Sequence, residues 1–397
     1  KAVKDTIAAS DLAKRIKPGD TVAIGGGSRG VTDIHKITRA IVNEVKALGA
    51  KPFIVPACGS HGNAIAEGQI EVLAGYGITE EFCGCPVRAS MEVIQVGSLS
   101  DGTPVYFDKI ASEASAVIPV NRIKAHTDIT GDFGSGVAKM LVIGFGKHKG
   151  ASTIHRRGLT CLKQSLREGS ELILSKMNVV LGIGIVENAY HQPTIIKAMN
   201  PETLLQEESQ LLIKSKELMA MLPADNIDLL VVQDIGKDIS GSGMDTNVIG
   251  RLGIWREPEF EKPVCTKIVA LRMTPLSHGN AVGVGLADFC PKTLVDQIDF
   301  DALYTNMLTA TYVQRGMLPI IMANEEEAIK AGLDTCWSVP HEKARIMFIK
   351  NTADIGTVYA SEALLPDILS RGYTRILGEP IEIQFTKNGQ LKDLEYE

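Results

Sequence analysis

Residues 21–57 read TVAIGGGSRGVTDIHKITRAIVNEVKALGAKPFIVPA and predict a strand, a helix and a second strand, in that order. The two apolar runs, Thr21–Ile24 and Pro52–Ala57, have the length of buried strands. Between them, from Asp33 to Leu48, apolar residues recur at the spacing of an amphipathic helix. Because a strand, a helix and a strand in succession form the unit of a parallel sheet, this segment indicates an α/β fold.

The glycines between the first strand and the helix are compatible with a nucleotide site. Gly25, Gly27 and Gly30 fit the pattern G-x-G-x-x-G, which places a dinucleotide phosphate at a helix N-terminus. Such a site also needs an acidic residue at the end of the second strand to bind the ribose, and this chain has Pro56-Ala57-Cys58 there. An NAD-type site therefore stays open only as an alternative.

The same alternation of strands and helices continues along the chain. Further strands are expected at 116–120, 140–143, 179–185, 229–232, 267–271 and 346–349, and further helices at 62–76, 160–175, 201–221, 294–299, 325–331 and 361–370. This order implies mainly parallel sheets, whose ligands bind beyond the carboxyl ends of the strands.

A chain of 397 residues is too long for one ordinary core. We expect two α/β domains with mainly parallel sheets and an active site in the cleft between them. The predicted boundary follows a charged helix that ends near Pro223, so that the domains comprise residues 1–224 and 225–378. Residues 379–397 predict a closing hairpin around an Asn388-Gly389 turn, and its return to the first domain is left open.

Composition excludes several classes of function. The formal net charge is −6 and no long run of lysine and arginine is present, so nucleic-acid binding is not expected. No apolar stretch reaches the roughly 18 to 20 residues of a membrane span. The seven cysteines lack the repeated pair spacing of a metal site and are expected to be reduced thiols. We therefore expect a cytoplasmic protein that acts on a small molecule.

Two segments carry histidines and a lysine among glycines. The first is Gly59-Ser60-His61-Gly62, directly after the second predicted strand. The second runs from His126, also just past a predicted strand, through Lys139 to His155. Its glycines are so frequent that we expect its backbone to lie against a ligand rather than against protein side chains. Tight turns with surface histidines are the alternative, and a solvated loop is the preferred interpretation for His148.

In chain order, these residues resemble the nickel-pincer nucleotide enzymes of the lactate racemase family. That family has an arginine turn after the first strand, matched by Ser28-Arg29-Gly30, and a Gly-x-His loop, matched by Gly59-Ser60-His61. It then has a histidine, a glycine-rich loop, a lysine and a further histidine. These are matched by His126, Gly134-Ser135-Gly136, Lys139 and His155. The resemblance covers most of the chain and is strongest between residues 17 and 155.

The resemblance implies a cofactor and the residues that hold it. Lys139 would tether a nickel-pincer nucleotide (pyridinium-3,5-bisthiocarboxylic acid mononucleotide nickel) as a thioamide. Gly134, Ser135 and Gly136 would contact this cofactor, and His155 would bind its nickel. Imidazole is a suitable ligand for nickel, which agrees with that role. Cofactor maturation proteins are implied as partners.

The resemblance also implies an activity, the racemisation or epimerisation of a 2-hydroxy acid by hydride transfer. His61 and His126 would be the acid/base pair, one for each stereoisomer, since an imidazole titrates near neutrality. Arg29 would bind the substrate carboxylate, with the cofactor phosphate as its alternative partner. A turn-capping role is the alternative for His61.

The second domain departs from the family pattern. Asp245 and Asn247 match its Asp-x-Asn segment and are expected to bind substrate. Gly250 and Gly253 stand about where a glutamine and a lysine reach the substrate in lactate racemase, and Arg251 is the nearest replacement. The predicted substrate is therefore a 2-hydroxy acid other than lactate.

Two alternatives remain at this stage. One is an NAD-type 2-hydroxy acid dehydrogenase that uses the turn after the first strand. The other is a non-catalytic pincer-nucleotide binding protein, which needs Lys139 and His155 but not an acid/base pair. The sequence leaves the oligomeric state and the roles of His191 and His278 open.

Overall fold

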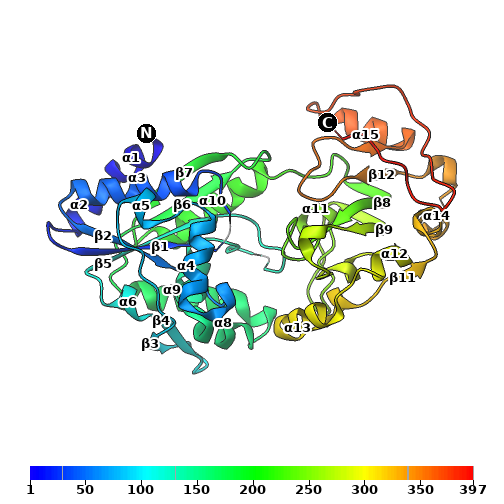
Figure 1. Cartoon of the computed structure of the whole chain (residues 1–397). Coiled ribbons are helices and arrows are strands. Elements are labelled where there is room, and N and C mark those ends of the chain that lie inside the picture. The colour runs from blue at the N-terminus through cyan, green and yellow to red at the C-terminus, as the bar shows by residue number, and fades with distance from the viewer. Residues whose placement is uncertain (29, 130, 338, 397) are drawn as a thin grey trace. The chain divides into compact units, whose positions relative to one another are not determined.

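The computed structural model describes residues 1–28, 30–129, 131–337 and 339–396. The chain folds into two compact units, Lys1–Met219 and Ala220–Glu397. Each unit is built on its own mainly parallel sheet flanked by helices (Figure 1). The predicted fold class of two α/β bodies is confirmed, whereas the cleft between them stays a prediction.

The first unit contains α1 (Ala2–Ala8), α2 (Leu12–Arg15), β1 (Thr21–Gly26), α3 (Ile34–Ala47), β2 (Lys51–Pro56), η1 (Gly62–Ala64), α4 (Ala66–Gly75), α5 (Glu80–Cys83), β3 (Val93–Ser98), β4 (Pro104–Asp108), α6 (Lys109–Ser112), β5 (Ala116–Arg122), α7 (Val137–Lys139), η2 (Met140–Gly144), α8 (Lys147–His155), α9 (Leu159–Lys176), β6 (Gly182–Glu187), β7 (Pro193–Met199) and α10 (Leu204–Leu218).

The main sheet of this unit has the strand order β2-β1-β5-β6-β7. β1 pairs in parallel with β2 on one side and with β5 on the other, so that Gly26 lies opposite both Pro56 and Val120. β6 continues the parallel arrangement, and β7 pairs with β6 antiparallel. The carboxyl ends of β1, β2 and β5 therefore lie at one edge, where open α/β sheets bind their ligands.

Helices cover both faces of this sheet because its strands are apolar on both faces. Ile24 of β1 packs in one cluster with Ile41 of α3. Ala23, its neighbour in the chain, points the other way and packs in a second cluster with Leu166 of α9. Successive residues of a strand alternate between its faces, so β1 is buried between two helical layers.

Residues 140–143 do not form the strand that the sequence predicted. Val137–Lys139 begins a helical segment, and Met140–Gly144 continues it as a buried π-helical turn. A short apolar run fits a buried strand and a buried helix equally well. Packing decides here, because Val142 lies so close to Gly169 of α9 that a Cβ on this glycine would come within 3.0 Å of it. The loop predicted around His155 is helical as well, since His155 ends α8.

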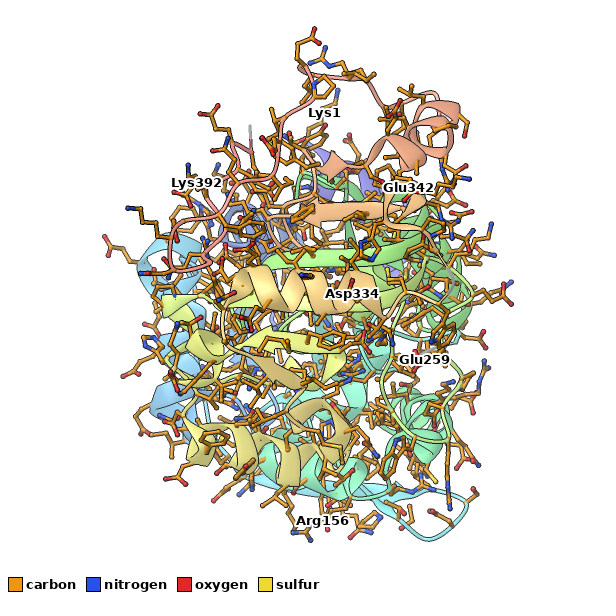
Figure 2. All side chains as sticks on the ribbon, turned by 90° about the vertical axis from the view of Figure 1, so that its right-hand side faces the viewer. Lys1, Arg156, Glu259, Asp334, Glu342 and Lys392 are labelled. Atoms are coloured by element: carbon orange, nitrogen blue, oxygen red, sulfur yellow. The ribbon has the colours of Figure 1, made fainter. Side chains whose placement is uncertain are left out.

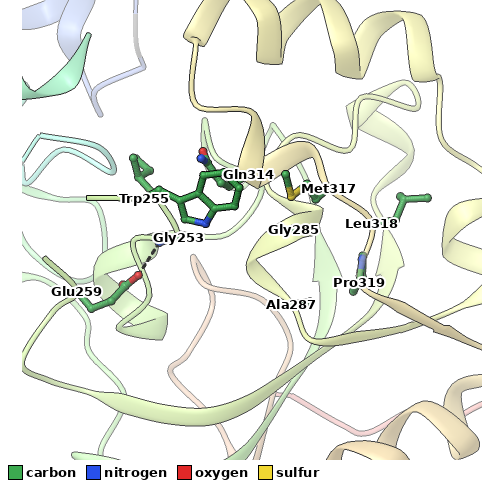
Figure 3. A pocket seen from close by; sticks show the side chains of 10 residues that line it. Gly253, Trp255, Glu259, Gly285, Ala287, Gln314, Met317, Leu318 and Pro319 are labelled. Carbon is green, nitrogen blue, oxygen red and sulfur yellow. Dashed lines mark hydrogen bonds between the residues drawn. The ribbon is translucent and has the colours of Figure 1, made fainter. Parts of the chain in front are cut away.

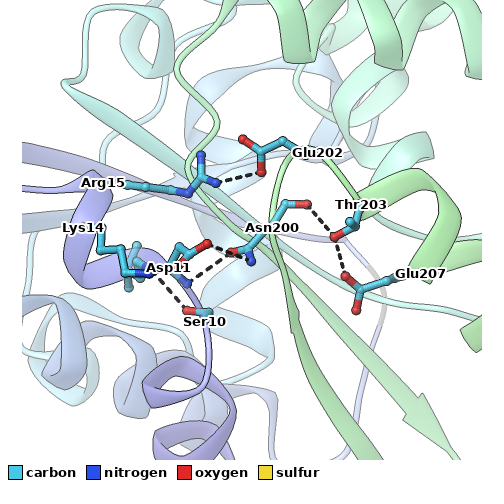
Figure 4. Close-up of polar contacts among 9 residues, drawn as sticks. Ser10, Asp11, Lys14, Arg15, Asn200, Glu202, Thr203 and Glu207 are labelled. Atoms are coloured by element: carbon cyan, nitrogen blue, oxygen red, sulfur yellow. Dashed lines mark hydrogen bonds and ion pairs between the residues drawn. The ribbon is translucent and has the colours of Figure 1, made fainter.

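The start of the chain is bound to the connection between β7 and α10 (Figure 4). The backbone N–H of Asp11 donates to Oδ1 of Asn200 at 3.2 Å, and Arg15 forms an ion pair with Glu202 at 2.7 Å. Thr203, next to them, donates to Glu207 at 2.5 Å. These contacts join residues almost 200 positions apart and make residues 1–219 one folded body.

The second unit contains β8 (Asn226–Ile235), α11 (Thr246–Ile249), β9 (Val264–Met273), η3 (Pro275–Ser277), η4 (Val284–Leu286), β10 (Phe289–Pro291), α12 (Lys292–Val295), α13 (Phe300–Ala310), η5 (Val313–Gly316), β11 (Ile320–Met322), α14 (Glu325–Asp334), η6 (His341–Lys343), β12 (Ile346–Ile349), β13 (Tyr359–Ala360), η7 (Glu362–Leu364) and α15 (Leu365–Ser370).

Its sheet has the order β11-β10-β9-β8-β12-β13, parallel except for β13. Helix α14, which ends at Asp334, lies across this sheet (Figure 2), and its Ile329 packs in one cluster with Val231 of β8. Leu391 belongs to the same cluster. The backbones of residues 384–392 pair around the predicted Asn388-Gly389 turn, so the closing hairpin packs on the second unit.

Candidate active site at the sheet edge of the first unit

Three loops of the first unit leave the sheet at the same edge. Ser28 follows β1, His61 follows β2, and His126 follows β5. Because β1 lies between β2 and β5, the strands that precede the two histidines are about 10 Å apart, which is twice the spacing of neighbouring strands. A small ligand at this edge therefore fits between the two loops.

His61 pairs with the serine of the neighbouring loop. Its Nδ1 lies 2.5 Å from Oγ of Ser28, and its side chain is exposed. A serine hydroxyl rotates and either donates or accepts a hydrogen bond. When it donates to Nδ1, the neutral imidazole carries its proton at Nε2; when it accepts, Nε2 is left with a lone pair. Arg29, the predicted carboxylate ligand beside Ser28, lies outside the described residues.

A buried polar network supports the His61 loop. Gln69 of α4 donates from Nε2 to the carbonyl of Gly59 at 2.9 Å and to that of His61 at 3.3 Å. Its Oε1 accepts from Nζ of Lys147 at 3.0 Å, and Lys147 also donates to the carbonyl of Pro56 at 2.5 Å. Lys147 begins α8. One buried ammonium therefore connects the end of β2, the His61 loop and the helix that ends at His155.

Backbone amides fix the ring of His126. The N–H groups of Asp128 and Ile129 point at Nδ1, with N···N distances of 3.0 Å and 3.3 Å. On the other side of the half-buried ring, Nε2 lies 2.5 Å from Nζ of Lys139. The nearest carboxylate oxygen of Asp128 is 3.7 Å from Nδ1, which is beyond hydrogen-bond distance. The imidazole thus joins the loop after β5 directly to the predicted tether lysine.

Glu208 of α10 caps the helical segment that carries Lys139. Its Oε2 accepts from the backbone N–H of Ala138 at 2.9 Å, while its Oε1 is buried and meets no hydrogen-bond partner among the described residues. Burial raises the pKa of Glu208 to about 7, against the lowering effect of the backbone N–H groups. A buried carboxyl that holds its proton in mildly acidic solution therefore positions the first turn of this segment.

The glycines before Lys139 are explained by packing within the protein, contrary to the expectation that they lie against a ligand. A Cβ on Gly134 would come within 2.4 Å of the carbonyl oxygen of Lys124, and one on Gly136 within 2.0 Å of the Glu208 carboxyl. Ser135 pairs its backbone with that of Lys124. Cofactor contacts of Gly134, Ser135 and Gly136 remain a prediction.

His155 lies within the electrostatic reach of the same group. Burial is the main effect and lowers the pKa of its imidazole, Lys139 lowers it further whenever it is charged, and the carboxylate of Asp128 opposes both effects. Part of the His155 side chain remains accessible to solvent, so the neighbouring residues do not bury it completely. A neutral imidazole has a lone pair available for a metal. His126, Asp128, Lys139 and His155 therefore form one group, with His61 on the other side of β1.

The predicted residues of the second unit have contacts within that unit. Asp245 caps α11, because its Oδ1 accepts from the backbone N–H of Asn247 at 3.1 Å and from Nδ2 of the same residue at 3.0 Å. The backbone N–H of Asp245 donates to Oγ1 of Thr352 at 2.9 Å. Both residues thus stabilise the turn after β8, and their contact with substrate remains a prediction.

Arg251 is held inside the second unit. Its Nη1 donates to the carbonyl of Leu286 at 2.9 Å and to Asp288 at 2.8 Å, and its Nη2 donates to the carbonyl of Cys265 at 3.1 Å. These contacts hold Arg251 within the second unit, and its role in substrate binding remains a prediction. Gly250 has φ +66°, and a Cβ there would come within 1.7 Å of the carbonyl oxygen of Pro263, so the fold requires glycine at this position.

The second unit also contains a pocket of about 330 Å³ (Figure 3). Trp255, Gln314 and Met317 line it, together with Glu259, whose Oε1 accepts from the backbone N–H of Gly253 at 3.0 Å. None of the predicted site residues lines this pocket.

Sequence reasoning missed four polar residues that shape the first site: Gln69, Asp128, Lys147 and Glu208. Only Glu208 had a usable signal. It lies at helical spacing between Leu204 and Leu212, both buried, and so occupies the core-facing side of its helix. Lys147 had no local signal, because its partners Pro56 and Gln69 are distant in the sequence.

The described residues contain no group of three or more His, Cys, Asp or Glu side chains that is placed to hold a metal ion. A metal at the first site would therefore need donors from a cofactor in addition to a protein imidazole. Among the described helices, none combines the length and the apolar character needed to cross a membrane.

Comparisons with known proteins identify the first unit. A model of the lactate racemase N-terminal domain matches residues 1–166. The lactate racemase apoprotein from Thermoanaerobacterium thermosaccharolyticum has a similar fold, with a TM-score of 0.52 and 14% sequence identity over 89% of this chain and 91% of that one. A comparison with curated protein sequences gave no match. Residues 1–166 of this chain are thus similar to the N-terminal domain of lactate racemase.

Proposed function

We propose that this chain is a racemase or epimerase of a 2-hydroxy acid and works with a nickel-pincer nucleotide tethered to Lys139. One observation carries the proposal. Within a domain of the lactate racemase family, Lys139 lies 2.5 Å from one of the two candidate acid/base histidines and interacts electrostatically with a third, His155. The proposed partners are a small 2-hydroxy acid and cofactor maturation proteins, and the proposed location is the cytoplasm.

The donor set fits this cofactor. A lysine amine forms the covalent bond, and the imidazole of His155, which its surroundings keep neutral, supplies one metal ligand. No all-protein metal site is available among the described residues, so the remaining donors would come from the pincer sulfurs and carbon. When bound, the group supplies a reversible hydride acceptor.

The protein's own contribution is to bind the substrate and to move its hydroxyl proton. His61 accepts or returns that proton at Nε2, and the rotating hydroxyl of Ser28 matches either state at Nδ1. His126 serves the other isomer from the loop on the far side of β1. The two histidines approach from different strands, which suits a planar keto acid whose faces must each be served by an acid/base group.

The second unit supports a substrate other than lactate. Backbone crowding keeps position 250 as glycine, and the guanidinium of Arg251 is bound within the fold. The glutamine and the lysine expected in this segment for lactate are therefore lacking, and we propose a differently substituted 2-hydroxy acid as the substrate.

The test uses protein made in a host that also produces the cofactor maturation proteins. Intact mass and nickel content report loading, and a panel of chiral 2-hydroxy acids reports racemisation. We expect an adduct on Lys139, loss of that adduct in Lys139→Ala, and no loss in Lys149→Ala, a matched exposed lysine of α8. Loaded protein that racemises no member of the panel would favour the non-catalytic binding protein.

The dehydrogenase alternative has less structural support. Gly25 lies inside β1, and a Cβ there would come within 2.4 Å of the Phe145 ring, so the first glycine of the motif serves packing. Net formation of a 2-keto acid that depends on added NAD(P) would revive this alternative.

A further inference from the structure

The hydrogen bonds of His126 determine where its proton lies. Its Nδ1 accepts from the backbone N–H groups of Asp128 and Ile129, and backbone amides are always donors. A ring nitrogen that accepts a hydrogen bond carries no proton. Because a neutral imidazole has one N–H group, the proton of His126 is at Nε2.

This tautomer constrains the partner of Nε2. The nitrogen faces Nζ of Lys139 at 2.5 Å, and a hydrogen bond needs one donor and one acceptor. An ammonium has three donors and no lone pair, so it cannot accept from Nε2–H. The opposite arrangement, in which an ammonium donates to Nε2, would place a proton on Nδ1 against two backbone N–H groups.

We propose that His126 holds Lys139 as a neutral amine in the protein before cofactor attachment, with the lysine lone pair accepting from Nε2–H. Lys139 is then a ready nucleophile, because an amine attacks electrophilic carbon and an ammonium does not. With an acylating reagent, the lysine nitrogen forms a bond to the acyl carbon, the leaving group departs with its electron pair, and the surplus proton passes to a solvent base.

The charged groups around Lys139 come from several elements. His155 of α8 opposes an ammonium whenever it is itself protonated. Asp128 works in the other direction and favours the ammonium. Glu208 of α10 carries no charge while it is protonated, and its Oε2 is occupied by a backbone N–H group. Of these groups, the Asp128 carboxylate is thus the one whose effect the hydrogen bond from His126 opposes.

The assignment of the neutral amine follows from geometry, and its use for cofactor attachment rests on the proposed function. The test uses apoprotein and needs no racemase activity. Acetylation with limiting N-hydroxysuccinimidyl acetate is followed from about pH 6 to about pH 10, and peptide mass spectrometry gives the rate at each lysine. Exposed Lys4 is the internal reference.

We expect the labelling of Lys139 to reach half of its maximum rate at least about two pH units below the midpoint of Lys4. In His126→Ala, the Lys139 midpoint should move back toward that of Lys4. Equal midpoints in the unmodified sequence would overturn the proposal, whether or not the loaded protein is a racemase. A low midpoint in a protein without racemase activity would uphold it while the proposed function failed.

A second measurement covers the case in which His126→Ala does not fold. In apoprotein labelled with ¹⁵N-histidine, the His126 signals should show a bare Nδ1 and a protonated Nε2. His126→Gln assigns the signals by their loss. A protonated Nδ1 at neutral pH would contradict the proposal independently of the labelling rates.

Discussion

Nζ of Lys147 lies 2.9 Å from Oδ2 of Asp108, and both side chains are completely inaccessible to solvent. Burial raises the pKa of the Asp108 carboxyl, and the charge of Lys147 lowers it again. The same ammonium donates to the end of β2 and to Gln69 beneath the His61 loop. This ion pair is therefore both a stability element and a support of the candidate site.

Removing one partner of this pair should destabilise the fold strongly. Lys147→Met leaves the Asp108 carboxylate buried without its counter-charge, and we expect a loss of about 3 to 5 kcal/mol in the free energy of unfolding. Lys14→Met removes an exposed lysine that pairs with Asp11, and should change stability by less than about 1 kcal/mol. Urea unfolding of the apoprotein measures both. Equal effects would mean that the buried pair contributes no more than a surface one.

Gln69→Leu should impair catalysis more than stability. The substitution removes both hydrogen bonds that hold the His61 loop and leaves its carbonyl groups free to shift. A displacement of about 1 Å is enough to lower a rate about 10²-fold. The measurement is the racemisation rate per loaded cofactor, with Gln206→Leu, an exposed glutamine of α10, as the matched control. An unchanged rate would show that the loop holds His61 without this glutamine.

Glu208 should give the first unit a distinctive pH dependence. Burial raises its pKa from the ordinary 4.5 to about 7, so between these values the folded state keeps a proton that the unfolded chain has lost. The proton on Glu208 therefore stabilises the fold fully below about pH 4.5, and this stabilisation decreases as the pH rises to about 7. The free energy of unfolding changes by up to about 3 kcal/mol across that window.

Glu208→Gln should remove this slope, because an amide oxygen still accepts from Ala138 but does not ionise. Urea unfolding of both proteins at a series of pH values gives the difference in stability. Glu207→Gln, the same change at the next position of α10, should leave the slope in place. Parallel curves for Glu208→Gln and the unmodified sequence would show that Glu208 does not titrate in this range.

The proposed nickel ligand is one of two histidines of α8, and the other serves as its control. His155 ends α8 in surroundings that keep its imidazole neutral, whereas His148 is exposed near the start of that helix. In protein from a cofactor-producing host, His155→Ala should lower nickel per chain at least about 10-fold, and His148→Ala should not. Elemental analysis decides. Equal nickel in both variants would remove His155 from the metal site.

The sequence predicted the edge of the site but not its interior. The apolar runs at 21–24, 52–57 and 116–120 predicted the strands β1, β2 and β5, and they also placed His61 after β2 and His126 after β5. By contrast, Lys147 and Gln69 meet across 78 positions, and no local pattern encodes such a pair. The run at 140–143 was assigned to the wrong element because a short apolar run has no diagnostic period. The glycines at 134 and 136 suggested a ligand, because the groups that fill their space, the Lys124 carbonyl and the Glu208 carboxyl, come from other segments of the chain.

Acylation of Lys139 should change the proton position on His126. An acylated nitrogen has its lone pair delocalised into the new carbonyl group, so it no longer accepts from Nε2–H and presents its own N–H instead. We expect Nε2 to become the acceptor for this N–H, and the imidazole proton to move to Nδ1 as the loop turns the N–H groups of Asp128 and Ile129 away from that nitrogen. Oδ2 of Asp128 lies 3.7 Å from Nδ1, and a small shift of the loop brings it within hydrogen-bond distance.

This switch would turn His126 from a proton donor into a base at Nε2 once the lysine is bonded, with Asp128 orienting the ring. The ¹⁵N-histidine signals of the apoprotein, recorded before and after acetylation of Lys139, should show the proton leaving Nε2 for Nδ1. Lys139→Met treated with the same reagent controls for acetylation at other lysines. In Asp128→Asn the carboxylate is absent, so the acetylated protein should keep less of the Nδ1–H form. If complete acetylation left the proton on Nε2, the lysine would not control the tautomer, and the basic form of His126 would have to arise from substrate binding instead.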